Sequence, residues 1–213
     1  MDPKVRQRLT RILSVVDVHG TAGPRLVDNA QRLFRRIEAF IRLGLVPESV
    51  DRDALELACY ALQLPMRDTK VLPPGKFGRT NLRDRVEQSA EILITTLGKE
   101  IDEDLLERAT RILLQLPHRN PGSDEAKTLA DALNLDDFGV AGLVAHIGQL
   151  AIQGAGISQV MEAADKREQY GYWEARLKDG FHFDPVRKLA RDRLDHARQV
   201  HKLLSEELSK DVP

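Results

Sequence analysis

Hydrophobic side chains recur at helical spacing along almost the whole chain. In the segment after Gly23, apolar residues repeat every three or four positions. They are Leu26, Val27, Ala30, Leu33, Phe34, Ile37, Phe40 and Ile41. Gly44 and Pro47 then end this helix, and a second apolar stripe over 101–116 is stopped by Pro117. Convincing strand-like alternation of apolar and polar residues is absent, so the pattern predicts an all-α protein.

The last helix is expected to begin at Asp184, a good N-cap residue, with Pro185 at its first helical position. The pattern predicts further helices over about 4–17, 51–64, 81–97, 124–134, 137–152, 157–168 and 171–178. The Pro- and Gly-rich stretches 65–80 and 117–123 are short enough to be loops inside one domain. We therefore expect a single-domain helical bundle over residues 1–213, with its core over about 24–208.

The composition narrows the class of protein without naming a function. The 213 residues include 32 Lys and Arg against 33 Asp and Glu, a net charge of -1 that gives no electrostatic argument for nucleic acid. No stretch approaches the ~20 apolar residues of a membrane span, so no membrane partner is expected. Cys59 is the only cysteine, which excludes an internal disulfide and favours a cytoplasmic protein.

The stretch 109–148 is the most informative part of the chain. A helix leads to His118, a polar turn follows, and the run Asp131–Gly139 reads Asp-Ala-Leu-Asn-Leu-Asp-Asp-Phe-Gly. This run resembles the HD superfamily of metal-dependent phosphohydrolases, in the branch that reads roughly Asp-Ala-Asp-x-Leu-Asp-x-x-Gly. The segment Gln88–Arg108 and the closing helix after Phe183 are similar to the same branch. The resemblance implies an all-α fold of the HD-domain type.

The resemblance also implies where metal ligands belong. In the family, one His comes from an early helix, an adjacent His-Asp pair ends the next helix, and a later Asp completes the set. Asp131 matches the later Asp. Leu62 and Gln63 stand in place of the His-Asp pair, and Asp28-Asn29 stands where the early His belongs. Three of the four ligands are therefore missing.

Leucine has no lone pair, and glutamine binds a transition metal far more weakly than imidazole or carboxylate does. Asp131 and Asp28 alone can hold at most a weak hard cation such as Mg²⁺. We therefore expect a catalytically degenerate HD-like protein, a binding or regulatory module without a cofactor. We expect it to keep a pocket at the former metal site, which we call the residual pocket. Its residues would be His118, Asp131, Asp28, Asn29 and Gln63. The alternative is a metal-dependent phosphohydrolase that acts on a nucleotide or another phosphoester and holds a divalent metal through displaced ligands.

The segment 65–85 carries a local positive charge, because its six Lys and Arg residues outnumber two Asp residues and leave +4. A Gly-Arg-Thr turn centred on Arg79 leads into a helix and can hold a phosphate through backbone N–H groups and the Arg side chain. In the related enzymes this loop borders the substrate entrance. We expect Arg79, with Lys76 and Arg83, to bind a nucleotide or phosphate; an ordinary solvated loop is the alternative.

Some residues also have plain structural interpretations. Cys59 is expected to be an inert core thiol, and His118 a surface-loop residue if it has no role in the residual pocket. For Asp131 the alternative is a solvated or hydrogen-bonding residue within a helix, and Asp136 and Asp137 are expected to cap the helix that follows. Half of the aromatic residues fall within 14 positions, where they would dock a segment onto the core or form a homodimer contact. They are Tyr170, Tyr172, Trp173, Phe181 and Phe183. A stacking surface for a base is the alternative.

Overall fold

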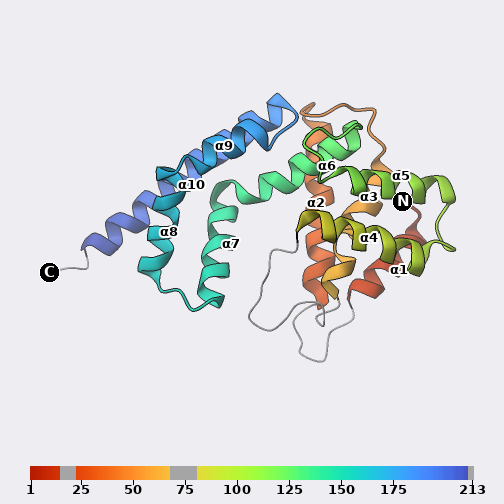
Figure 1. Ribbon diagram of the computed structural model, residues 1–213, viewed down its shortest axis with the longest axis horizontal. Helices are drawn as coiled ribbons and strands as arrows, with labels where there is room; N and C mark the ends of the chain where they lie inside the picture. Colours follow the sequence, from red (N-terminus) through yellow and green to blue (C-terminus); the bar gives the residue numbers. More distant parts are fainter. Residues whose placement is uncertain (15–22, 68–80, 211–213) are drawn as a thin grey trace. The chain divides into compact units, whose positions relative to one another are not determined.

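The structure is a computed structural model that describes residues 1–14, 23–67 and 81–210. Every regular element in these ranges is a helix, which confirms the all-α prediction (Figure 1). The α-helices are α1 (Pro3–Leu13), α2 (Gly23–Arg42), α3 (Arg52–Ala61), α4 (Leu82–Leu97), α5 (Glu103–Gln115), α6 (Asp124–Asn134), α7 (Gly139–Ile152), α8 (Ile157–Gln169), α9 (Tyr172–Asp179) and α10 (Asp184–Lys210). Two short 3-10 helices follow α3 and α6, namely η1 (Leu64–Arg67) and η3 (Leu135–Asp137).

The internal contacts divide the chain into two compact units, Met1–Ala130 and Asp131–Pro213. The division falls inside α6. We call them the N-terminal unit and the C-terminal unit. The expectation of one domain of the HD type over residues 1–213 stays a prediction.

Helix α3 forms the centre of the N-terminal unit. Every residue from 54 to 65 is buried, and α2, α4 and α5 pack on this helix. Its N-cap Asp51 accepts the backbone N–H of Ala54 at 3.0 Å and binds Arg108 of α5 at 2.7 Å. The buried Glu56 accepts two hydrogen bonds from the guanidinium of Arg6 on α1, at 2.6 and 2.8 Å. Buried packing around α3 thus stabilises the N-terminal unit, and the carboxylates of Asp51 and Glu56 connect α3 to α5 and α1.

Cys59 lies on α3 and is fully buried, which confirms that it is a core residue. Burial raises the pKa of its thiol far above the ordinary value, because a thiolate loses the solvation that water gives it. The thiol is therefore protonated and unreactive in the folded chain.

The C-terminal unit is built on the packing of α7 along α10, with α8 and α9 beside them (Figure 1). The Phe138 ring forms edge contacts with the rings of Trp173 and Phe181, at centroid distances of 5.2 and 5.3 Å. These contacts confirm that part of the aromatic cluster docks a segment within the fold. Tyr170, by contrast, is 77% exposed and makes no such contribution.

The turn from η3 into α7 depends on a glycine. Gly139 has φ +85, and a Cβ atom there would lie 3.2 Å from Cβ of Arg193 on α10. Phe138, in an extended conformation, is the N-cap of α7 and provides no side-chain cap. The prediction that Asp136 and Asp137 cap this helix is therefore wrong, because both residues belong to η3 and the cap position falls one residue later.

Candidate functional site

Asp131 is the predicted site residue with the most unusual surroundings. It lies in α6 and its side chain is fully buried. Its two carboxylate oxygens accept the backbone N–H groups of His182 at 2.8 Å and Phe183 at 3.0 Å, just before α10. The carboxylate thus stabilises the turn between α9 and α10 through two hydrogen bonds. This confirms the hydrogen-bonding interpretation of Asp131, whereas the solvated one is wrong.

Three more side chains hold the same turn. The amide of Asn134 donates to the carbonyl oxygen of Gly180. Arg176 donates from Nη2 to Oδ1 of Asn134 at 3.1 Å, and Arg187 donates from Nη2 to the carbonyl oxygen of Phe181 at 2.7 Å. Side chains of α6 and α10 therefore satisfy consecutive backbone groups of the turn, as buried polar groups require, and Arg176 of α9 binds the amide of Asn134.

Burial raises the pKa of Asp131 to about 7, because the charged form of a carboxyl group is disfavoured away from water. The two backbone N–H donors and the positive charge of Arg187 act in the opposite direction and favour the charged form. A general base must reach a substrate proton, and both oxygens of Asp131 already accept backbone donors. The geometry thus indicates a structural carboxylate that titrates near neutral pH.

The other four residues of the residual pocket lie in the N-terminal unit. Asp28 is exposed and Asn29 half-buried on α2, and Gln63 is buried directly after α3. His118 is exposed in the turn after α5, as a surface-loop residue would be. Across the described ranges, no hydrogen bond or ion pair joins any two of these four side chains. Their association with Asp131 stays a prediction.

Two of the three predicted anion-binding residues, Lys76 and Arg79, lie outside the described residues, and their role stays a prediction. Arg83 is exposed in the first turn of α4, and its Nε lies 3.4 Å from Oε1 of Glu87. An exposed pair of this kind contributes about 1 kcal/mol or less to stability. Arg83 is therefore available at the surface.

Arg85, which sequence reasoning counted only as part of the basic segment, has a more specific position. It is half-buried, and its Nε and Nη2 donate to the carbonyl oxygen of Leu62, at 3.1 and 2.9 Å. This carbonyl lies at the C-terminal end of α3, where the partial negative charge of the helix dipole favours a cation. Among the described residues no carboxylate pairs with Arg85, and desolvation lowers its pKa. Arg85 lies four residues before the buried Ser89, and residues four apart lie on the same face of a helix, so the helical spacing was a signal that Arg85 faces inward.

The residues present do not fit the metal site that the resemblance implies. Leu62 is fully buried and offers no donor, Gln63 provides only an amide, and the oxygens of Asp131 serve the backbone of a turn. Within residues 1–14, 23–67 and 81–210, no three His, Cys, Asp or Glu side chains gather closely enough to hold a metal ion.

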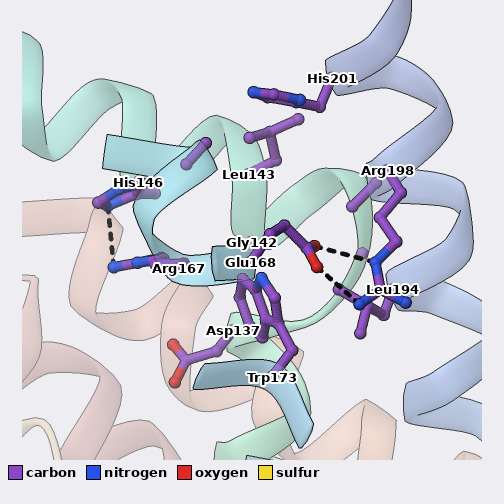
Figure 2. A pocket seen from close by; sticks show the side chains of 13 residues that line it. Asp137, Gly142, Leu143, His146, Arg167, Glu168, Trp173, Leu194, Arg198 and His201 are labelled. Carbon is purple, nitrogen blue, oxygen red and sulfur yellow. Dashed lines mark hydrogen bonds and ion pairs between the residues drawn. The ribbon is translucent and has the colours of Figure 1, made fainter. Parts of the chain in front are cut away.

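A pocket of about 90 Å³ lies within the C-terminal unit, between α7, α8, α9 and α10 (Figure 2). Its lining includes the imidazoles of His146 and His201, the guanidinium groups of Arg167 and Arg198, and the indole of Trp173. The sequence predicted Trp173 in an aromatic cluster, but no sequence pattern indicated that residues from four different helices line one pocket.

Comparison with known proteins finds no family model, no curated protein and no solved structure that matches this chain. None of the helices in the described part of the chain combines the length and the apolar character needed to cross a membrane.

Proposed function

We propose that this chain is a degenerate protein of the HD type that binds a phosphate-bearing ligand, such as a nucleotide, without hydrolysing it. The observation that carries the proposal is the position of Arg85. Its guanidinium binds the carbonyl oxygen of Leu62 and has no carboxylate partner among the described residues. The resemblance implies a metal-binding His-Asp pair at Leu62 and Gln63, and the cationic Arg85 beside Leu62 supports an anion site in its place.

Electrostatics favours binding of an anion at this place over binding of a metal. Like charges a few Å apart repel by several kcal/mol even at an effective dielectric constant of about 20. A divalent metal near Leu62 would meet this repulsion from Arg85, whereas a phosphate would be attracted. The guanidinium also retains N–H donors beyond the two that bind Leu62, and Arg–phosphate contacts are charge-assisted.

The basic segment 65–85 supports the same interpretation from the sequence. The segment has a local charge of +4, and its last residues, which include Arg83 and Arg85, form the first turn of α4. Arg79 and Lys76 then supply the longer-range attraction, which is screened over ~8 Å at physiological ionic strength.

The test is a thermal-shift and calorimetric screen of inorganic phosphate and of nucleoside mono-, di- and triphosphates with the full chain. Loss of one charge-assisted Arg contact costs roughly 1.5–3 kcal/mol, so Arg85→Gln should weaken binding about ten-fold or more. Arg79→Ala should weaken binding as well, and more strongly at low salt.

Arg111→Gln is the matched control, because Arg111 is exposed on α5 and already pairs with Glu107. It should leave affinity unchanged. Hydrolysis of a phosphoester that requires a divalent metal and is lost in Asp131→Ala would favour the alternative, a metal-dependent phosphohydrolase. About one transition-metal ion per chain, lost in the same variant, would do so too.

A further inference from the structure

The pocket of the C-terminal unit has mostly apolar walls. Leu143 of α7, Ala164 of α8, and Leu194 and Ala197 of α10 line it, and the indole of Trp173 on α9 adds a flat aromatic surface. Figure 2 shows Leu143, Leu194 and Trp173 around this space, each from a different helix. A ligand that enters this space must therefore have an apolar body.

Most charged groups of the lining are already paired within the protein. Glu168 accepts two hydrogen bonds from Arg198, at 2.9 and 2.7 Å, and Glu174 also binds Arg198 at 3.1 Å. Asp137 accepts a hydrogen bond from Arg176 at 2.6 Å. Both acidic residues of the lining, Asp137 and Glu168, are therefore already bound to an arginine.

Arg167 is the exception. Its guanidinium lies 5.1 and 5.7 Å from the ring centroids of Tyr172 and Trp173, and no carboxylate pairs with it in the part of the chain that the structure describes. Its Nη2 lies 3.3 Å from Nδ1 of His146 (Figure 2). An arginine nitrogen only donates, so in this contact Arg167 is the donor and Nδ1 of His146 the acceptor.

We propose that this pocket binds a small monocarboxylate with a short apolar body, of the size of butyrate. The pocket volume of about 90 Å³ admits only a small ligand. The guanidinium of Arg167, which has no carboxylate partner among the described residues, complements one negative charge. The carbon-rich walls distinguish an organic anion from inorganic phosphate, whose surface is entirely polar.

The sole tryptophan of the chain, Trp173, gives a direct readout. Titration of the full chain with butyrate should produce a saturable change in tryptophan fluorescence, with a Kd on the order of 1 mM for so small a ligand. The neutral analogue 1-butanol and inorganic phosphate should each bind at least about ten-fold more weakly, because one lacks the charge and the other the apolar body.

Arg167→Gln should weaken butyrate binding about ten-fold or more by calorimetry. Lys166→Gln is the matched control: Lys166 is the preceding residue, is exposed, pairs with Glu162 and does not line the pocket. It should leave the affinity unchanged. Ala164→Leu fills the space while keeping every charge, and should abolish binding in a variant whose circular dichroism spectrum matches the wild type.

Three results would overturn the proposal: no saturable signal with butyrate at about ten times the expected Kd, equal binding of 1-butanol or phosphate, or unchanged affinity in Arg167→Gln. The proposal is independent of the anion site near Arg85. Arg85→Gln should leave butyrate binding intact, and Arg167→Gln should leave binding of phosphate ligands intact, so the two can fail separately.

Discussion

The buried carboxylate of Asp131 makes the stability of the C-terminal unit depend on pH in an unusual direction. Its pKa is raised from 3.8 to about 7 in the folded chain, so the folded state binds more protons than the unfolded state between these values. The stability contributed by the protonated form is fully present below about pH 4 and is lost as the pH rises through about 7. Each unit of pKa shift corresponds to 1.36 kcal/mol, which gives about 4 kcal/mol for the whole range.

Asp131→Asn removes this titration and keeps the shape of the side chain. At about pH 5 the protonated carboxyl group and the amide each offer one carbonyl oxygen to the N–H groups of His182 and Phe183. At about pH 8 the wild type has a buried charge and the variant has none. The variant should therefore gain about 2–3 kcal/mol relative to the wild type between these two conditions.

The assay is urea unfolding at both pH values, followed by the fluorescence of Trp173, which lies in the same unit. Asp192→Asn changes an exposed aspartate of α10 and serves as the control, with an expected effect within about 0.5 kcal/mol at either pH. A free-energy difference between wild type and Asp131→Asn that is constant, or that moves in favour of the wild type as the pH rises, would refute the reasoning.

Other substitutions test the packing. Gly142→Ala should destabilise the protein by about 1–3 kcal/mol in urea unfolding, because a Cβ atom would lie 2.3 Å from a backbone oxygen of the preceding turn. Gly148→Ala on the same helix meets nothing within 4 Å and should stabilise it by about 0.5–1 kcal/mol. Glu56→Gln should cost about 1.5–3 kcal/mol, because the charge-assisted bonds from Arg6 are lost. Cys59 should resist alkylation at neutral pH in the folded chain and react once urea is added, as mass spectrometry can show.

Local patterns in the sequence are enough to predict most of the helices. The predicted helix over 124–134 coincides with α6, because its apolar residues and its boundaries are local signals. The start of the last helix is also confirmed to within one residue, although Asp184 is the first residue of α10 and not its N-cap. The cap of α7 was missed because it depends on the left-handed turn at Gly139, which fits against α10 and leaves Phe138 as the cap.

The candidate site was harder to predict, because its interactions join residues that are far apart in the chain. The partners of Asp131 are backbone N–H groups about fifty residues later, and no side-chain pattern marks them. Arg85 was hidden among the basic residues of its segment, and its bond to the carbonyl oxygen of Leu62 follows from the packing of α4 on the end of α3. A sequence pattern indicates which residues face inward, but it does not identify the atoms they meet.

Phosphorus NMR of the full chain mixed with the best phosphate ligand from the screen, in the presence of Mg²⁺ or Mn²⁺, tests the central claim most directly. The account predicts that the ligand signals shift or broaden on binding, that the effect is lost in Arg85→Gln, and that the phosphoester stays intact over hours. Release of inorganic phosphate at a rate that depends on the metal and on Asp131, or binding that is indifferent to Arg85, would contradict it.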